Sequence, residues 1–254
     1  MAAVYAFVYI FIFLIAVTYI ENFRKFNRII FPLEAEVKKF LPIYFPFYRK
    51  LSFRKKILFE KKVKLFLNSF EYRVKEGFEI TPEVKAVLGG AAIRMTFYLP
   101  DECFDYYNTI VLFPEPYHSR ITGKYHKGEV NPGAKIIVFS WSSIKQGLDP
   151  HDDGLNVLIH EYAHALYFEH KLMSDNYDVF NPEAFRRCLE QADIELEKFK
   201  KEEHQFLRKY ASTNREEFFA VATESFFERS ATFKKDLPEL YGTLVLLFRQ
   251  DPLH

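Results

Sequence analysis

The sequence predicts an α+β fold that is mostly helical and contains a small sheet. Two short runs, NTIVLFPEPY (108–117) and AKIIVFSW (134–141), are rich in β-branched and aromatic residues and are closed by proline, glycine or serine, which is typical of strands. Before and after them, apolar residues recur at intervals of three and four, the spacing of amphipathic helices. The helical spacing continues from Pro150 almost to the end of the chain.

The predicted elements follow one another in a regular order. The run KKVKLFLNSFEYRV (61–74) predicts a helix, and TPEVKAVLGGAAIRMTFYL (81–99) predicts another, which Gly89 and Gly90 can interrupt. The segment between the two strands, HSRITGKYHKGEVNPG, has the composition of a loop or hairpin. The later helices are expected around Leu155–Leu166 and within 182–210, 215–230 and 237–250. The first of these can be capped by Asp149, Asp152 or Asp153.

The first twenty residues, MAAVYAFVYIFIFLIAVTYI, carry no charged side chain. At about 1.5 Å per residue, a helix of this length spans the roughly 30 Å hydrocarbon core of a bilayer, so residues 1–21 are predicted to be a transmembrane anchor. A cleaved secretory signal is the rival interpretation, but no basic segment precedes the apolar run. Basic residues follow it, and the positive-inside rule places the rest of the chain in the cytoplasm. Residues 22–59 are predicted to be a juxtamembrane connector and 60–254 one domain.

Composition limits the functions that the domain can have. The chain has 35 Lys and Arg against 34 Asp and Glu, so it has no general electrostatic attraction to nucleic acid. The two cysteines, Cys103 and Cys188, are far apart and form no CxxC pair. Neither a disulfide framework nor a thiolate zinc site is indicated, and any metal ligands must be nitrogen and oxygen atoms.

The segment NVLIHEYAHALYFEH (156–170) contains the residues that suggest chemistry. His160 and His164 are four residues apart, so on a helix both imidazoles project from one face and can bind the same zinc ion. Glu161 lies beside them, in the position from which a carboxylate takes a proton from water without being a ligand. The alternative interpretation is a core helix with two hydrogen-bonded histidines.

A catalytic zinc needs a third protein ligand, and the sequence offers several. His170 has the spacing of the third metzincin histidine, but that class requires glycine at the position of Tyr167. His170 is therefore predicted to be a helix-end or surface residue. The other candidates are Glu216, Glu217 and Glu224 in REEFFAVATESFFE, where a second helix packed beside the first would supply an oxygen ligand. Periodicity alone does not choose among them.

These segments together resemble the MtfA-like zinc-dependent peptidases, the family typified by the titration factor of the Mlc repressor. The resemblance covers most of residues 60–252 and rests on FLNSFEYRVKEGFEI, IVLFPEPY, GLNVLIHEYAHAL, EEFFAVATESFFE and LYGTLVLLFRQDP. It implies a zincin-like metallopeptidase domain, Zn²⁺ as cofactor and an aminopeptidase-like preference. It also implies that Glu217 is the third metal ligand and that Glu224 orients a ligand imidazole.

Resemblance gives two further residues a role. MtfA-like enzymes have a histidine in the loop between the two strands that can reach the metal in a self-inhibited state, and His126 in GKYHKGEV matches it. Tyr210 precedes Glu217 by seven residues, a pattern similar to that in the catalytic domain of anthrax lethal factor, which implies a hydroxyl that assists the oxyanion. A solvent-exposed loop histidine and an ordinary helix-end tyrosine fit these two positions equally well. The strand IIVFSW is expected to be the edge to which an extended peptide adds.

The sequence therefore predicts a membrane-tethered zinc metallopeptidase. His160, His164 and Glu217 hold the metal, Glu161 is the general base and Tyr210 assists. The expected partners are a peptide substrate, the membrane through the N-terminal helix and a regulatory protein, with no direct contact to nucleic acid. The alternative is a non-catalytic protein that sequesters a transcriptional regulator, but such a protein needs no base beside the histidines. The apolar N-terminus departs from the soluble family prototype, which puts the repressor partnership in doubt.

Overall fold

A computed structural model describes residues 32–75, 77–119, 123–148, 155–173, 178–201, 206–207 and 209–254. The predicted transmembrane anchor lies outside these residues, and so do Asp149, Asp152 and Asp153, the predicted helix caps. Within the described part of the chain, no helix has both the length and the apolar character needed to cross a bilayer.

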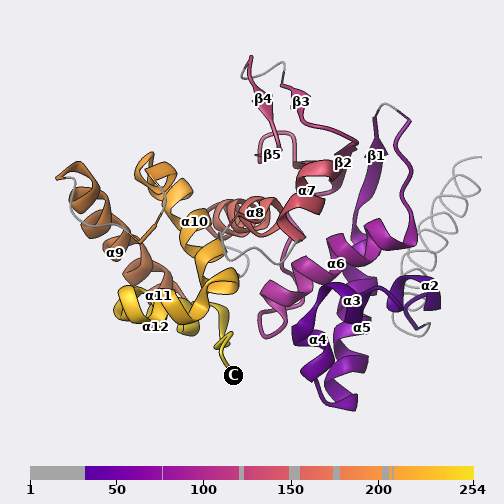
Figure 1. The fold of residues 1–254 in the computed structure, drawn as a ribbon, viewed down its shortest axis with the longest axis horizontal. Coiled ribbons are helices and arrows are strands. Elements are labelled where there is room, and N and C mark those ends of the chain that lie inside the picture. Colours follow the sequence, from indigo (N-terminus) through magenta and orange to yellow (C-terminus); the bar gives the residue numbers. More distant parts are fainter. Residues whose placement is uncertain are drawn as a thin grey trace, which may run out of the picture.

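The fold is α+β and mostly helical, as predicted (Figure 1). The described helices are α2 (Ala35–Lys38), α3 (Leu41–Tyr44), α4 (Pro46–Lys50), α5 (Phe53–Ser69), α6 (Pro82–Thr96), α7 (Trp141–Leu148), α8 (Val157–Met173), α9 (Pro182–Lys200), α10 (Arg215–Glu228), α11 (Ser230–Asp236) and α12 (Pro238–Phe248), with a 3₁₀ turn at Lys209–Ser212. The strands are β1 (Glu71–Val74), β2 (Thr109–Phe113), β3 (Tyr117–His118), β4 (Tyr125–His126), β5 (Gly128–Asn131) and β6 (Ile136–Ser140). In Figure 1, α8 runs between the N-terminal helices α2–α6 and the C-terminal helices α9–α12.

Four strands form one sheet in the order β1-β2-β6-β5. The first three are parallel, and β5 runs antiparallel to β6. The predicted helix over 61–74 is wrong at its end: α5 stops at Ser69, and the residues after it pair with β2, with Tyr72 opposite Ile110. Pairing with a distant strand overrides the local helical spacing, because Tyr72 and Val74 suit a pleated surface as well as a helix.

The predicted edge strand is also wrong. IIVFSW contains β6, which lies inside the sheet between β2 and β5. The edge beside it is β5, four residues whose composition predicts a loop, and both β5 and β6 pack against α8. The helix α7, which directly follows β6, is likewise absent from the sequence prediction.

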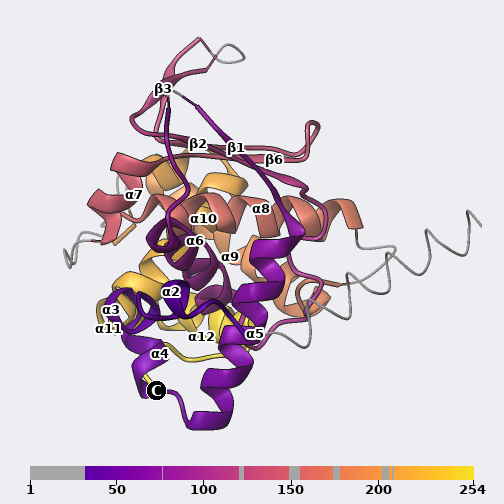
Figure 2. The ribbon, with the colours of Figure 1, turned by 90° about the vertical axis from the view of Figure 1, so that its right-hand side faces the viewer.

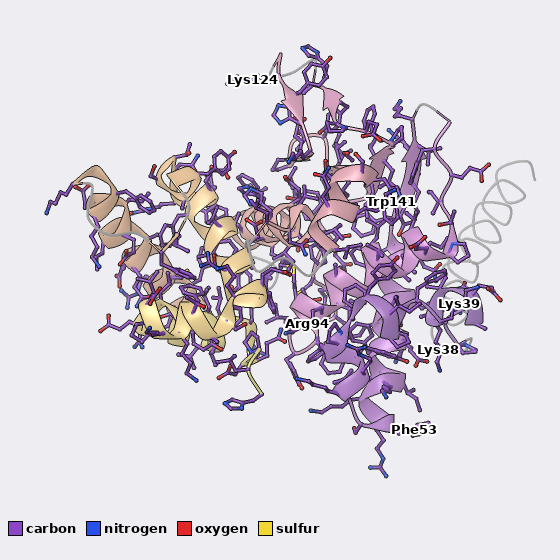
Figure 3. The ribbon with its side chains drawn as sticks, viewed as in Figure 1. Lys38, Lys39, Phe53, Arg94, Lys124 and Trp141 are labelled. Atoms are coloured by element: carbon purple, nitrogen blue, oxygen red, sulfur yellow. The ribbon has the colours of Figure 1, made fainter. Side chains whose placement is uncertain are left out.

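The sheet covers the helices on one face (Figure 2). Alternate residues of β2 and β6, including Ile110 and Phe139, belong to the main core, whereas Val111 and Val138 lie on the other face with Tyr117. The strands β3 and β4 form a separate antiparallel hairpin that projects beyond the sheet (Figure 2), and Lys124 lies near its tip (Figure 3).

Helix α6 is continuous through the two glycines that were expected to interrupt it. A Cβ added at Gly90 would overlap the ring of Phe45, so the glycine allows the N-terminal segment to approach α6 closely. Val37 and Leu41 are buried in the same core. The core therefore extends upstream of residue 60, into the segment predicted to be a connector.

Candidate metal centre

Helix α8 carries the HExxH residues through the middle of the fold. Its N-terminus is capped by Asn156, whose Oδ1 accepts a hydrogen bond from the backbone N–H of Ile159 at 3.2 Å and whose carbonyl accepts that of His160 at 2.9 Å. Glu161 and His164 are buried, and His160 is partly buried. The cap fixes the first turn of α8, from which the first histidine projects.

Helix α10 supplies the third side chain. Asn214 caps α10 by accepting a hydrogen bond from the backbone N–H of Glu217 at 2.8 Å. Glu217 is thus in the first turn, where the helix dipole favours a carboxylate. Phe218 and Phe219 are buried, and α10 packs extensively against α8. This packing brings a glutamate that is far away in sequence to the two histidines.

Three potential ligand atoms converge between α8 and α10. Nε2 of His160 and Nε2 of His164 are 3.2 Å apart, and each lies 3.3 Å from Oε2 of Glu217. Among the described residues, these three form the group of His, Cys, Asp and Glu side chains that could hold a metal ion. The atoms thus form a nearly equilateral triangle.

The size of this triangle fits a metal ion, and so does the missing hydrogen bond at one of its three atoms. Ligand atoms of a tetrahedral zinc ion with bonds of about 2.0–2.2 Å lie roughly 3.3 Å apart. Oε2 of Glu217 is buried and makes no hydrogen bond of regular geometry with any described group. A buried carboxylate oxygen without such a bond is costly, and a cation between the three atoms would remove that cost.

A hydrogen-bonded chain fixes the orientation of His160. Its Nδ1 lies 2.9 Å from Oε2 of Glu224, so the proton on Nδ1 faces that carboxylate and Nε2 faces Glu217. Oε1 of Glu224 accepts the backbone N–H of Asn156 at 2.7 Å. The side-chain amide of Asn156 in turn donates to Glu228 at 3.1 Å.

The charges of the site are strongly coupled. Burial lowers the pKa of His160, but its contacts with Glu217 and Glu224 outweigh burial and raise the pKa to about 10. Burial raises the pKa of Glu217, but the two imidazoles outweigh it and hold the pKa well below its usual range. Without a cation in the triangle, the proton therefore resides on an imidazole rather than on the carboxylate.

Glu161 is buried against β5 and is not one of the three converging residues. Burial raises the pKa of its carboxyl, against the opposing effect of His160 and His164. A Cβ added at Gly128 on β5 would lie 2.6 Å from Cγ and 2.8 Å from Oε1 of Glu161. Only a glycine at this point of the edge strand leaves room for the Glu161 side chain as it stands.

Tyr210 and His126 both lie at the open side of the centre. The Tyr210 hydroxyl donates to Oε1 of Glu217 at 3.1 Å, although the residue is 52% exposed. A cavity of about 470 Å³ is lined by residues that include His126, His160, Glu161 and Tyr210. His126 therefore shares the cavity but is outside the group of three converging ligand atoms.

The other candidate ligands lie elsewhere. His170 is in the last turn of α8, as predicted, but it is buried rather than at the surface, and its ring packs on Phe180 and Phe185. Burial lowers its pKa. Glu216 is not part of the converging group, and neither is Glu224, which contacts His160 from the side of Nδ1.

Sequence reasoning missed three residues that shape the centre: Asn156, Gly128 and Asn214. Asn156 directly precedes an apolar helical run, and Asn214 lies three residues before the glutamate Glu217; both are recognisable N-cap signals. Gly128 carries no such signal, because its role depends on the contact of an edge strand with α8.

Fold and site together define a protein in which two histidines of one helix and a glutamate of a second can hold a metal ion. The chain matches the family described as glucose-regulated metallo-peptidase M90 over residues 23–249. This match covers most of the chain, so the protein belongs to that metallopeptidase family. Membership implies a metal ion and peptide substrates, and it confirms the resemblance to the MtfA-like peptidases.

Individual relatives agree with this assignment. The chain is 27% identical over 245 residues to the uncharacterized protein slr2042 of Synechocystis sp.. The aligned region covers 87% of this chain and 86% of that relative. It is 25% identical over 195 residues to Mlc titration factor A of Serratia proteamaculans, covering 70% and 73% of the two chains. For Mlc titration factor A of Edwardsiella ictaluri the identity is 25% over 166 residues, covering 59% and 62%.

Proposed function

We propose that this metallopeptidase is a zincin-like zinc enzyme that hydrolyses peptide bonds with Glu161 as general base. The observation that carries the proposal is the triangle of His160 Nε2, His164 Nε2 and Glu217 Oε2, with edges of 3.2–3.3 Å. Two imidazoles and one carboxylate are a donor set of catalytic zinc, which keeps a further position for water or substrate. When bound, zinc supplies the Lewis acidity that polarises a carbonyl and acidifies water.

The residues around the ligands keep the site in a state ready for the metal. Glu224 holds the Nδ1 proton of His160, so Nε2 is the nitrogen directed at the centre. Asn156 holds Glu224 through its backbone N–H. Glu217 is fixed by the Asn214 cap at its backbone and by Tyr210 at its second oxygen.

Glu161 moves the proton. Its carboxylate accepts a proton from the attacking water as the water oxygen bonds to the peptide carbonyl carbon. The same proton then passes to the amine nitrogen as the carbon–nitrogen bond breaks, which returns Glu161 to its ionised form. Burial raises the pKa of Glu161 and so stabilises the protonated form that this side chain has between the two proton transfers.

Tyr210 and His126 are proposed to act from the cavity side. The Tyr210 hydroxyl can exchange its contact with Glu217 for a hydrogen bond to the developing oxyanion. His126 is proposed as an inhibitory fourth ligand in a resting state, and its place in the lining of the cavity supports this. Turnover then requires the β3–β4 hairpin region to move His126 away.

The proposed substrate is a peptide bound along β5. This strand is a sheet edge, lies next to α8 and includes Gly128 beside Glu161, so a peptide added to it passes the general base. The aminopeptidase-like preference is proposed from the resemblance to the family. Comparing free and N-acetylated forms of the same peptides tests it: acetylation is expected to abolish cleavage.

A peptide-library digestion with the full chain tests the reaction. Glu161→Gln keeps the size of the side chain and removes the base, so it is expected to retain the metal and the fold but to lose roughly 10²–10⁴-fold in rate. Glu216→Gln, which changes a neighbouring acid outside the centre, is the matched control and is expected to cleave like the parent. Equal cleavage by the parent and Glu161→Gln contradicts the proposed mechanism.

A second function is favoured by one observation, the name Mlc titration factor A carried by several relatives. We propose that this chain also binds a regulatory protein. Pull-down with the Glu161→Gln variant separates the two functions, because a purely regulatory role survives the loss of the base. Membrane attachment through residues 1–21 remains a proposal from the sequence.

A further inference from the structure

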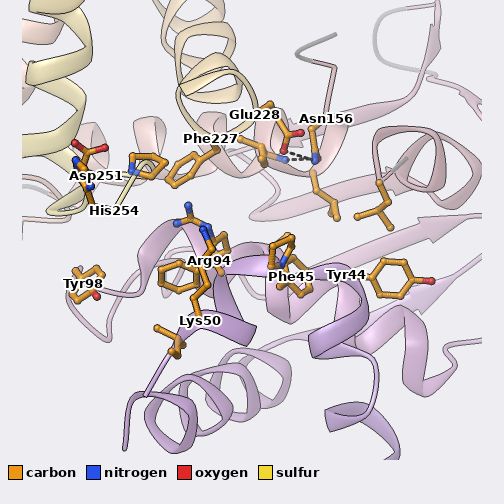
Figure 4. Close-up of a pocket in the computed structure, with 18 of the residues that line it drawn as sticks. Tyr44, Phe45, Lys50, Arg94, Tyr98, Asn156, Phe227, Glu228, Asp251 and His254 are labelled. Atoms are coloured by element: carbon orange, nitrogen blue, oxygen red, sulfur yellow. Dashed lines mark hydrogen bonds between the residues drawn. The ribbon is translucent and has the colours of Figure 1, made fainter. Parts of the chain in front are cut away.

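A second and larger cavity has a volume of about 570 Å³ (Figure 4). Its walls come from the α3–α4 segment, the beginning of α5, α6, the end of α7, the beginning of α8, the end of α10 and the residues after α12. None of the three converging ligand residues lines it, and Glu161 does not either. The cavity shares Gly147 and Asn156 with the cavity at the metal centre. It is therefore a separate space with a common wall.

Arg94 places a cation in this cavity (Figures 3 and 4). Its guanidinium carbon lies 4.2 Å from the ring centre of Phe47 and 4.8 Å from that of Phe227, so the group is held between two aromatic rings. Nη1 donates to Oε1 of Gln250 at 2.6 Å. The stacking and this hydrogen bond fix the plane of the guanidinium.

No anion of the described residues is in contact with the charge of Arg94. Among the described residues, Gln250 is the only hydrogen-bond acceptor of its guanidinium, and Arg94 takes part in none of their ion pairs. A guanidinium has five N–H donors, so most of them have no protein acceptor in this part of the structure. Burial lowers the pKa of Arg94 to about 10, against the opposing charge of Glu228. A packing role explains the stacking but leaves these donors without a function.

The surroundings define the anion that fits. The acidic groups in the lining already have partners: Glu228 accepts from Asn156, and Asp251 accepts from Tyr241 and from the backbone N–H of Leu253. The lining carries three cationic side chains, Arg94, Lys50 and Lys55, against the carboxylates of Glu228 and Asp251. With a net of one positive charge among these side chains, the site suits a single negative charge better than a phosphate dianion. A carboxylate matches the two-pronged donor geometry of arginine.

The remaining walls suit an apolar body. Phe45, Phe47, Leu148 and Phe227 line the cavity, and Tyr98 adds a further ring. The volume lies within the range of about 300–1,000 Å³ that is typical of small-molecule sites. The cavity thus joins a fixed cation to apolar and aromatic surfaces.

We propose that this cavity binds a small organic monocarboxylate with an aromatic or branched apolar body. The carboxylate accepts hydrogen bonds from Arg94, and the body packs on the rings around Phe45 and Phe227. The ligand contacts the wall that contains Asn156, the residue whose backbone holds Glu224.

Calorimetric titration of the full chain with 3-phenylpropionate tests the proposal. Because a carboxylate can also bind a metal ion, the titration uses chelator-treated protein and is repeated with Glu217→Gln. Binding is expected to persist in both, and to be at least about tenfold tighter than that of the neutral 3-phenylpropanamide. Phenyl phosphate is expected to bind more weakly than the carboxylate. A stronger response to the phosphate, or equal binding of the carboxylate and the amide, overturns the proposal.

Variants locate the site. Arg94→Met removes the cation and is expected to abolish the preference for the carboxylate over the amide. Arg229→Met is the matched control, because Arg229 also stacks on a ring, that of Phe206, but does not line the cavity. Arg94→Lys keeps the charge but loses the two-pronged donor geometry of the guanidinium, so it is expected to bind the carboxylate about tenfold more weakly. This variant replaces Arg94→Met as the test if Arg94→Met fails to fold. Unchanged carboxylate binding by folded Arg94→Met or Arg94→Lys contradicts the assignment.

Discussion

Gly128→Ala tests whether the edge strand positions the general base. The added methyl group would lie 2.6 Å from Cγ, 2.9 Å from Cδ and 2.8 Å from Oε1 of Glu161, whereas ordinary contacts begin at 3.4 Å. Either β5 or the Glu161 side chain must move by roughly 1 Å. A displacement of this size in a reacting group costs about 10²-fold in rate, because the proton acceptor no longer lies on the path of the attacking water.

The same substitution should spare the metal. None of the three converging ligand residues is among the nearest neighbours of the new methyl group, so the metal content is expected to equal that of the parent. Overpacking should lower the free energy of unfolding by about 1–3 kcal/mol. The assay is kcat/KM on one good library peptide, measured together with the zinc-to-chain ratio and a urea unfolding curve.

Two comparisons make the test specific. Gly133→Ala lies in the turn after β5, where the new Cβ meets its nearest neighbour at 3.5 Å, and is expected to be nearly neutral. Combining Gly128→Ala with Glu161→Gln should cost no more than Glu161→Gln alone, since both act on the same carboxylate. Parent-like kcat/KM in folded Gly128→Ala, or fully additive losses in the double variant, refutes this reasoning.

The remaining predictions concern the metal and the packing. Glu224→Gln removes the anionic acceptor of the His160 Nδ1 proton and should weaken zinc binding about 10–100-fold in a chelator competition; unchanged affinity contradicts the orienting role. Zinc affinity should rise about tenfold per pH unit between roughly pH 6 and 8, because His160 must lose a proton to bind the metal and its pKa is raised to about 10. Calorimetry at several pH values measures this slope, and an affinity that does not change with pH contradicts the prediction. Gly90→Ala should lower the free energy of unfolding by about 1–3 kcal/mol through its overlap with Phe45, whereas Gly242→Ala, which meets nothing within 4 Å on α12, should raise it by about 0.5–1 kcal/mol. Urea denaturation of both glycine variants measures the difference, and equal effects argue against the close approach of the N-terminal segment.

Local sequence was sufficient for the part of the site that lies on one helix. The spacing of His160 and His164 determines which face they share, whatever the rest of the chain does. Glu217 was different: three glutamates of one segment were equivalent by periodicity, and only the resemblance selected one. The structure adds the physical reason, which is that the first turn of α10 faces the imidazoles while Glu224, two turns later, faces the Nδ1 side of His160.

Features that depend on contacts between distant segments are not predicted by the local sequence. Tyr72 could extend a helix or join a sheet, and the presence of β2 decides. The strand β5 has a composition typical of loops, so the sequence predicts β6 as the edge. The contact of Gly128 with Glu161 depends on how β5 packs against α8, which no local pattern indicates. Arg94 had no signal in the sequence, because its two stacked rings come from distant segments.

The most direct test of the central claim is the zinc-to-chain ratio of the purified full chain and of two single variants. Three atoms about 3.3 Å apart on His160, His164 and Glu217 predict about one zinc per parent chain. Glu217→Gln is expected to lose most of this zinc, whereas Glu216→Gln is expected to retain it. A parent chain without stoichiometric zinc under metal-replete conditions, or equal zinc in both variants, contradicts the account.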